Sequence, residues 1–600
     1  MVYKLRRILN RREKFQVVAL LVAIVAMAFS QALGVASVLP FISLVMEPNH
    51  VYENRLLHWA YEYFNFSSIN RFIFFIGVVM LAIIVFSNAI SAFSTWIKLR
   101  FVWMNNHRLS KRLLEKYLSM PYAFFLNQNS ADLSKNVLSE VNQLTNSYLM
   151  PLLNIISRSL ISIFILIMLF IIDIVISVAA IVLIGGSYAV IYWRINSKLK
   201  QRGASRMQAN EMRFKAVNEA FGGIKEIKVM NREPYFLKSY ARFSFLHASL
   251  MSWNAVIGQL PRYAFETVAF GGIILFVLIM LLTRENVSQV IPLAGVFAFS
   301  GYRLMPAIQD IFTSLTQMRF NQAVLDRIYQ DIMAGDDCAD KELLLGRGPG
   351  VVALPFTNEI RLEKVSFYYP SNRAEVLKEV DLRIAYNSTI AFVGPTGAGK
   401  TTLVDIILGL LLPQQGKMLV DGIRVDEHNI LNWQRNIGYV PQFIYLSDDS
   451  VARNIAFGMP DNEIEPNKLK RAAKIADIYE LIAQELPHGF DTLVGERGIR
   501  LSGGQRQRIG IARALYHDPE VLVFDEATSA LDGATEDAVL QAMDNAARLK
   551  TLIVIAHRLT TVKHCDQIYM LDKGRIVDSG TYSELLERNQ QFRSMAKVNV

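Results

Sequence analysis

The stretch Gly394-Pro-Thr-Gly-Ala-Gly-Lys400-Thr401 decides how the second half of this chain folds. It follows a β-like apolar run at 389–393 and precedes a helical pattern at 403–412. Glycines in this context let backbone N–H groups curl around phosphates, a lysine reaches the β- and γ-phosphates, and a hydroxyl binds Mg²⁺. The sequence therefore predicts a phosphate-binding loop formed by Gly394, Pro395, Thr396, Gly397, Ala398, Gly399, Lys400, Thr401 and Thr402.

Further motifs follow this loop in a fixed order. Gln442 stands after Tyr439-Val-Pro441, and the segment Leu501-Ser-Gly-Gly-Gln505 comes next. The apolar run 521–524 then ends in Asp525 and Glu526, and His557 closes the apolar run 552–556. Each motif alone is a weak signal, but chance does not produce the ordered series.

Composition divides the chain into two parts. Six hundred residues exceed what one hydrophobic core organises, so we expect at least two domains. The apolar fraction is 52%, and nearly all long apolar runs lie before about residue 322. Cys338 and Cys565 lie outside those runs without CxxC spacing, which predicts neither a disulfide framework nor a metal site.

The net charge of +10 includes a dense cluster of basic residues at the amino terminus. Six basic residues precede the first apolar run, which is too long for a signal peptide and lacks a small-residue cleavage site, so we expect a retained membrane span. Anionic lipid, not nucleic acid, is the expected partner of this cluster. Its members are Lys4, Arg6, Arg7, Arg11, Arg12 and Lys14.

Six apolar segments are long enough to cross roughly 30 Å of hydrocarbon. The connections 98–148 and 194–254 are long, helical in pattern and rich in Lys and Arg, whereas the other connections between spans are shorter. The positive-inside rule therefore places both long connections and both termini in the cytoplasm, where ATP is. The expected spans cover about 16–46, 72–97, 149–172, 174–193, 255–282 and 287–312.

These motifs together resemble the ATP-binding-cassette transporters over nearly the whole chain, with exporter-type membrane helices. The resemblance implies an α-helical membrane domain of six transmembrane helices plus a cytoplasmic α/β P-loop ATPase domain. The expected boundaries are 15–322 for the membrane domain, 323–358 for a linker and 359–596 for the nucleotide domain. In this family two nucleotide domains sandwich two ATP molecules, so one cassette per chain implies a dimer. We expect a homodimer, and a heterodimer with a similar partner is the alternative.

The resemblance also assigns roles in the ATP site. Tyr369 would stack on adenine, Glu526 would be the general base for the attacking water, and His557 would contact the γ-phosphate. Gln442 would sense Mg²⁺ and the water. The alternatives are a structural acid at Glu526 and an incidental histidine. Expected Mg²⁺ ligands are Thr401, Gln442 and Asp525, and the opposite subunit would contribute Ser502, Gly503, Gly504 and Gln505 to ATP.

Three segments of the membrane half carry further expectations. The turns 121–127 and 218–223 match the family's coupling helices, although simple interhelical turns would explain them too. Residues 48–66 alternate apolar and polar side chains at helical spacing, which predicts an amphipathic external helix. Bacterial flippases of lipid-linked oligosaccharides have such a helix at this place; the alternative is an interfacial loop anchored by Trp59 and tyrosines.

Three intramembrane arginines, Arg158, Arg262 and Arg303, are candidates for substrate contact because charge in the membrane is costly. At 1.5 Å per residue all three lie in the inner-leaflet half, where a guanidinium fork suits the phosphate oxygens of a lipid headgroup. Internal ion pairs of Arg262 with Glu266 and of Arg303 with Asp310 would satisfy these charges without substrate.

The leading hypothesis is an ATP-driven transporter in a bacterial inner membrane that flips a polyprenyl-diphosphate-linked oligosaccharide to the outer leaflet by alternating access. Export of another lipid, a drug or a peptide is the alternative. A non-pumping ATP-gated channel or regulator is the hypothesis from another class, and intact Glu526 and His557 argue against it.

Overall fold

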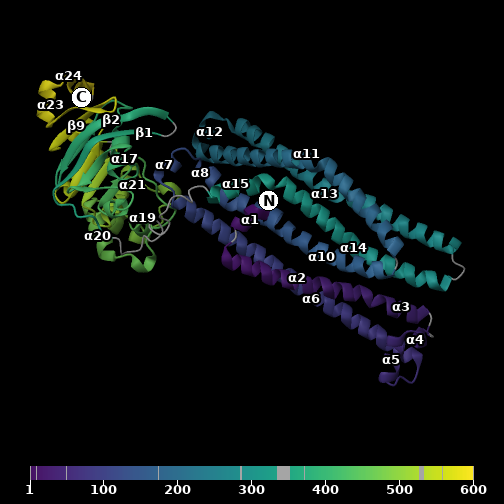
Figure 1. The fold of residues 1–600 in the computed structure, drawn as a ribbon. Helices are drawn as coiled ribbons and strands as arrows, with labels where there is room; N and C mark the ends of the chain where they lie inside the picture. Colours follow the sequence, from purple (N-terminus) through teal and green to yellow (C-terminus); the bar gives the residue numbers. More distant parts are fainter. Residues whose placement is uncertain are drawn as a thin grey trace. The chain divides into compact units, whose positions relative to one another are not determined.

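The structure is a computed structural model that describes every residue except 1, 9, 47, 49, 173, 284–286, 334–351, 370–371, 526–532, 557 and 599–600. Contacts divide the chain into two units (Figure 1). The first comprises Met1–Met120 and Gln128–Lys341 and is helical. The second comprises Pro121–Asn127 and Glu342–Val600 and contains the β-sheets.

The first unit includes helices that are much longer than a membrane span. α6 (Ile69–Leu118) has 50 residues, which is about 75 Å at the α-helical rise, against roughly 30 Å of hydrocarbon. α11 (Ile174–Gly222) and α13 (Glu233–Thr283) are equally long. The others are α2 (Arg11–Ala36), α3 (Val38–Met46), α10 (Met150–Ile172) and α14 (Val287–Phe320).

Shorter helices complete this unit. The amphipathic pattern at 48–66 folds into α4 (His50–Glu53) and α5 (Arg55–Tyr63), whose apolar side packs on Leu44 and Phe72. The first part of the segment expected as a linker is helix α15, whose apolar face is buried. The remaining short helices are α1 (Val2–Ile8), α8 (Ser130–Lys135), α9 (Val141–Leu144), α12 (Ile224–Met230) and α15 (Gln322–Met333), with π-helical turns η1 (Asn136–Glu140) and η2 (Thr145–Leu149).

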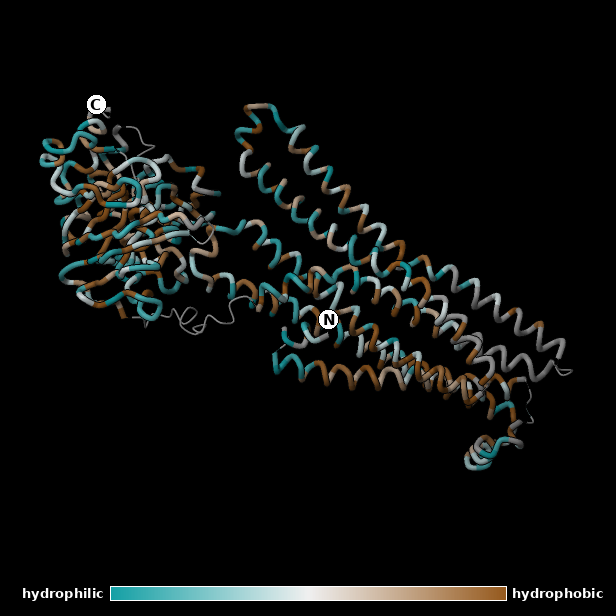
Figure 2. Tube along the Cα trace, turned by 45° about the horizontal axis from the view of Figure 1, so that its top comes forward, coloured by the Kyte–Doolittle hydropathy of each residue, from teal (hydrophilic) through white to brown (hydrophobic). Residues whose placement is uncertain are grey.

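Packing of the long helices fits lipid as the solvent. α10 contacts both α2 and α14, and α11 contacts α13 and α14 (Figure 1). Large apolar side chains such as Phe74 and Phe86 stay exposed, and the middle of α2 and α6 is hydrophobic in Figure 2. Water would penalise that surface, whereas hydrocarbon does not. Among the described residues, Arg11–Val45, Ile69–Leu118 and Ser130–Ile171 have the length and hydropathy to span a membrane.

The second unit contains two sheets with the strand orders β2-β1-β4-β5 and β10-β9-β3-β8-β7-β6. The first is antiparallel. In the second, β3, β6, β7, β8 and β9 are parallel and only β10 is antiparallel. The strands are β1 (Glu359–Tyr369), β2 (Asn372–Ala385), β3 (Thr389–Val393), β4 (Gln415–Val420), β5 (Ile423–Arg424), β6 (Ile437–Val440), β7 (Val521–Asp525), β8 (Thr551–Ile555), β9 (Gln567–Asp572) and β10 (Arg575–Gly580).

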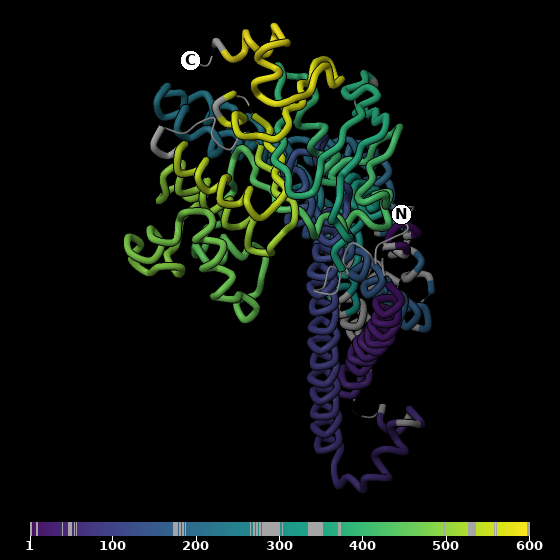
Figure 3. Tube along the Cα trace, turned by 90° about the vertical axis from the view of Figure 1, so that its left-hand side faces the viewer, coloured from purple at the N-terminus to yellow at the C-terminus, as the bar shows by residue number. Residues whose placement is uncertain are grey.

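Helices cover the parallel sheet, which explains why its central strands are continuous apolar runs instead of alternating ones. All five residues of β8 are buried, and Phe392 and Phe524 are fully enclosed. Figure 3 shows the helical region around residues 451–500, in green, to one side of the sheets. The helices are α17 (Lys400–Ile407), α18 (Ile430–Gln434), α19 (Val451–Ile455), α20 (Pro466–Ile475), α21 (Gly503–Leu515), α22 (Gly533–Ala547), α23 (Tyr582–Arg588) and α24 (Gln590–Val598).

Candidate functional site

The glycine loop joins the carboxyl end of β3 to the start of α17, at the sheet edge where ligands bind in open α/β folds. Gly394 has φ +148° and Gly399 has φ +100°. A Cβ at Gly394 would lie 2.1 Å from the carbonyl oxygen of Leu571, and one at Gly399 would lie 2.9 Å from a Leu377 methyl. Backbone conformation and close packing both require glycine at these positions.

Lys400 opens α17 and its ammonium closes the loop. Nζ donates hydrogen bonds to the carbonyl oxygens of Gly394 at 2.8 Å and Pro395 at 3.2 Å, and the residue is 6% exposed. The next side chain, Thr401, is exposed at the same end of the helix. The loop therefore holds one buried cation and one exposed hydroxyl beside its backbone N–H groups.

Tyr369 ends β1 and is linked to the helix that follows the loop. Its phenol forms a 2.9 Å hydrogen bond with the hydroxyl of Thr402, and its ring packs edge-on against Phe367 with centroids 5.0 Å apart. The ring is therefore held in one orientation next to the glycine loop. Its neighbour Tyr368 is 40% exposed and lies on the other face of the strand.

Asp525, the last residue of β7, lies among other polar groups. The Tyr439 phenol donates to its Oδ2 at 3.3 Å. Burial, together with the negative charges of Asp525 and Asp405, raises the pKa of Tyr439, so the phenol stays protonated. Burial and then the charge of Asp525 raise the pKa of Asp405, on α17, to about 6. Sequence reasoning did not identify Asp405 or Tyr439, because their role depends on proximity to Asp525.

Gln442 lies exposed just after β6, which pairs with β7. Its strand therefore ends at the same edge of the sheet as Asp525. Glu526 and His557 lie outside the described residues. Each follows the carboxyl end of a described strand in sequence, β7 for Glu526 and β8 for His557.

The segment Leu501-Ser-Gly-Gly-Gln505 forms the amino end of α21. Ser502 Oγ accepts from the N–H of Gln505 at 3.2 Å, and the Gln505 side chain accepts from the N–H of Ser502 at 2.9 Å. This capping box fixes the first turn, with Ser502 and Gly503 exposed and Gly504 buried. The side-chain carbonyl oxygen of Gln505 is therefore engaged within its own helix.

The segment Pro121–Asn127 belongs to the second unit. It contains the four-residue helix α7 (Tyr122–Phe125), and Ala123 packs against the core formed by β1, β2 and α17. Burial, followed by the charge of Asp405, raises the pKa of the Tyr122 phenol. Asp405 thus interacts with Tyr122 on one side and with Asp525 on the other. The second expected turn, 218–223, lies where α11 ends, with Phe221 exposed.

In the membrane helices, Asp310 forms an ion pair that the sequence did not predict. Asp310 on α14 pairs with Arg158 on α10, from Nε to Oδ2 at 2.8 Å. The two are on different helices, so spacing within α14 could not reveal the pair. The side chain of Arg303 lies outside the described residues. Arg262 pairs with Glu266 at 2.8 Å, as the alternative of internal pairing predicted.

Lys98 is a charged group that the sequence interpretation missed. It lies on α6, and its Nζ donates to Oδ1 of Asn154 on α10 at 2.7 Å. Asn154 is one helical turn before Arg158 on α10, so the two residues lie on the same face of that helix. The hydrogen bond to Asn154 therefore brings the Lys98 ammonium to the face of α10 that carries Arg158. Lys98 also interacts electrostatically with Arg158 and Asp310. The expected span ended at residue 97, immediately before this lysine.

No group of three or more His, Cys, Asp or Glu side chains that could hold a metal occurs in the described part of the chain. Mg²⁺ needs only one or two protein oxygens, because phosphates and waters complete its octahedron. Thr401 at the start of α17, Gln442 after β6 and Asp525 at the end of β7 each carry a side-chain oxygen on a segment at the carboxyl ends of the parallel strands.

A strand–glycine-loop–helix site in one unit and membrane-spanning helices in the other define an ATP-hydrolysing membrane protein. The family model described as "ABC transporter" matches residues 377–529, and "ABC transporter transmembrane region" matches residues 17–244. The chain belongs to the ABC transporters, as an exporter-type half-transporter with fused membrane and ATP-binding domains. It is an ATPase coupled to transport, and a half-transporter of this type implies a dimer in a membrane.

Known proteins similar to this chain cover most of its length. The ATP-dependent lipid A-core flippase of Alkalilimnicola ehrlichii is 30% identical over 496 residues, 81% of each chain. The heterocyst differentiation ATP-binding protein HepA of Nostoc sp. is 30% identical over 508 residues, 82% of this chain and 81% of that protein. A bacterial Atm1-family ABC exporter with ATP bound has the same fold, with a TM-score of 0.76, 22% identity and 98% of both chains covered.

Proposed function

We propose that two copies of this chain form a homodimer in which each glycine loop faces the α21 turn of the other copy, with ATP between them. The exposed Ser502 and Gly503 support this arrangement, because a glycine in the first turn of α21 lets a γ-phosphate approach the helix backbone and the positive end of the helix dipole. Lys400 turns from the carbonyls of Gly394 and Pro395 to the β- and γ-phosphates. Tyr369 stacks on the adenine.

Hydrolysis needs a metal, an activated water and stabilisation of charge on the γ-phosphate. Thr401, Gln442 and Asp525 would hold Mg²⁺, which when bound would neutralise phosphate charge. Glu526, next to Asp525, accepts the proton of the attacking water, and His557 binds the γ-phosphate. Tyr439 keeps the Asp525 carboxylate oriented through its 3.3 Å hydrogen bond.

Coupling to the membrane helices uses the α7 segment. Tyr122 and Asp405 interact inside the second unit, and Asp405 also interacts with Asp525. A change of charge at the metal site therefore alters the surroundings of Tyr122 directly. We assign the α7 segment as the contact through which closure of the ATP site moves the helices that flank residues 121–127.

The proposed substrate is an anionic amphiphile of the inner leaflet, with polyprenyl-diphosphate-linked oligosaccharide as the leading candidate. The observation that supports it is the Lys98–Arg158–Asp310 cluster, which carries a net charge of +1. Arg158 lies 14 residues before the end of α10, about 20 Å along the helix. Arg262 and Arg303 extend the proposed contact region, and the flippase relatives favour a lipid over a soluble substrate.

The assay that tests this function is ATP-dependent flipping in vesicles. The purified protein is reconstituted with a fluorescent polyprenyl-diphosphate oligosaccharide, and its exposure on the opposite leaflet is followed with and without ATP. Movement of this lipid only with ATP supports the proposal, whereas movement of an unrelated lipid, drug or peptide in its place supports the alternative exporter. Equal flux without ATP identifies a non-pumping channel.

The proposed function also implies how the chain is oriented in its membrane. We infer a multi-pass protein of a bacterial inner membrane with both termini in the cytoplasm, since the Lys- and Arg-rich helices α11 and α13 extend on the side that carries the ATP site in this family. The relatives compared above include proteins of bacteria, which is consistent with this membrane.

A further inference from the structure

A pocket of about 590 Å³ lies at the amino end of α2, outside the proposed transport path. Five of its lining residues come from one stretch of chain around the start of that helix, and the sixth comes from α6. The residues are Asn10, Arg11, Arg12, Glu13, Gln16 and Arg108. Three of the six are arginines, so the pocket is basic.

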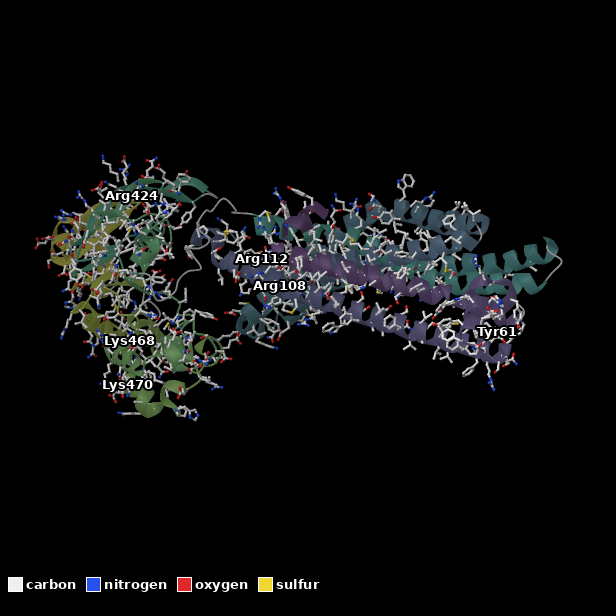
Figure 4. All side chains as sticks on the ribbon, turned by 60° about the horizontal axis from the view of Figure 1, so that its bottom comes forward. Tyr61, Arg108, Arg112, Arg424, Lys468 and Lys470 are labelled. Carbon is white, nitrogen blue, oxygen red and sulfur yellow. The ribbon has the colours of Figure 1, made fainter. Side chains whose placement is uncertain are left out.

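The single carboxylate of the pocket is already neutralised. Glu13 is 2% exposed, and its Oε1 lies 4.0 Å from Nη1 of Arg108 and 3.6 Å from Nη2 of Arg112. Its Oε2 accepts the backbone N–H of Asn10 at 2.7 Å. Arg108 and Arg112 are one helical turn apart on α6 and are labelled in Figure 4. The buried pairing leaves the charges of Arg11 and Arg12 for a ligand.

Arg108 is also held in place from the other side. Its Nη1 donates to Oε1 of Gln16 at 2.9 Å, so α2 and α6 are joined across the pocket by two contacts to the same guanidinium. By contrast Lys4, earlier in the same basic cluster, pairs with Asp326 of α15. Within the amino-terminal basic cluster, Lys4 therefore contacts another helix, whereas Arg11 and Arg12 line an open pocket.

The apolar surface next to the pocket indicates what kind of molecule the pocket binds. Phe15, Val18 and Val22 follow on α2 and are 75%, 57% and 66% exposed. Figure 2 shows α2 changing from hydrophilic at its start to hydrophobic along its length. A basic pocket that borders an apolar, lipid-facing helix surface fits a molecule with an anionic head and acyl chains.

We propose that this pocket binds the phosphate of an anionic phospholipid in the leaflet at the start of α2. Arginine suits this ligand because its planar fork donates two parallel hydrogen bonds to phosphate oxygens. Binding there places a lipid between α2 and α6, the two helices that Glu13 already links. The site is separate from the Lys98–Arg158 cluster, so it stands whether or not the proposed substrate is correct.

Native mass spectrometry of the full-length dimer in detergent tests the proposal, with phosphatidylglycerol and phosphatidylcholine as probes. R11Q/R12Q is compared with K14Q/K111Q, which removes the same charge from exposed lysines on the same two helices that do not line the pocket. The pocket predicts about tenfold weaker phosphatidylglycerol binding in R11Q/R12Q, a change within twofold in K14Q/K111Q, and no change for phosphatidylcholine.

Three results would overturn the assignment. Equal losses in the two double variants would show a diffuse charge effect, and unchanged binding in R11Q/R12Q would exclude the pocket. Competition by millimolar inorganic phosphate as effective as that by the lipid would point to a soluble ligand. Because Arg11 and Arg12 are exposed, the variants are expected to keep the dimer, which the same spectra report directly.

Discussion

The Arg158 guanidinium on α10 forms an ion pair with the Asp310 carboxylate on α14, with 2.8 Å between Nε and Oδ2. Each side chain is more than a third exposed, so the pair stands at a surface and not inside the helix packing. With Lys98 nearby, the group holds two cations for one carboxylate. An anionic headgroup can therefore bind without displacing Asp310, since one positive charge is in excess.

The excess charge gives a direct test of the substrate class. Replacing Lys98 by Gln should slow ATP-driven flipping of a diphosphate lipid about tenfold, the effect of losing one charged hydrogen bond. Flipping of a neutral lipid should change less than twofold. The matched control is K225Q, which removes an exposed lysine on α12 far from the cluster in sequence. Equal slowing of anionic and neutral lipids would contradict the headgroup role.

Two substitutions of Tyr369 distinguish stacking of its ring on the adenine from the hydrogen bond of its hydroxyl. Replacing it by Ala should weaken ATP binding about tenfold, because stacking of a base on an aromatic ring contributes roughly 1–3 kcal/mol. Y369F keeps the ring but loses the 2.9 Å bond to Thr402, so its affinity should stay within threefold. Y368A, at the exposed neighbouring ring, serves as control. Binding is measured by titration with a fluorescent ATP analogue.

The fold was predictable because its signals are local. The apolar runs at 389–393 and 521–524 were expected to be strands and are β3 and β7, and the glycine loop lies between β3 and α17 as expected. Pairings between distant segments were not predictable. Asp310 is more than 150 residues from Arg158 in sequence, and helical spacing suggested a neighbour on its own helix instead.

The same distinction applies within the ATP site. The motif for Gln505 indicated a ligand contact, but whether its amide is free depends on the helix start, and the structure shows it in a capping box. Asp405 carries no motif at all. Its importance comes from its electrostatic interaction with Asp525 at the end of β7, which sequence periodicity does not report.

Glu526 is proposed as the general base, and its replacement should affect chemistry more than binding. E526Q should lower ATP turnover at least about a hundredfold, the usual contribution of general base catalysis, while ATP affinity changes less than threefold. E520Q, at the start of the same strand region, should hydrolyse ATP normally. Turnover is measured by phosphate release in vesicles. Normal turnover in E526Q would exclude the proposed role.

His247 on α13 should make stability depend on pH. Burial, then the charges of Arg213 and Arg206, lowers the pKa of its imidazole from 6.5 to about 4, and Arg213 lies 3.3 Å from its Nδ1. The folded chain thus keeps His247 neutral at pH 5, whereas the unfolded chain binds a proton below pH 6.5. The unfolded state binds more protons in this window, so stability is lost as pH falls from 6.5 towards 4.

The wild type should therefore show a larger drop in thermal midpoint between pH 7 and pH 5 than H247Q, whose side chain does not titrate. H107Q, at an exposed histidine of α6, should keep the wild-type slope. Differential scanning fluorimetry in one detergent and one salt concentration gives the comparison. Because Arg206 next to His247 is buried beside Glu140, with 3.7 Å between their charged groups, relaxation of this region at low pH should reach the α11 helix. Equal slopes for wild type and H247Q would show that His247 is protonated in the folded state.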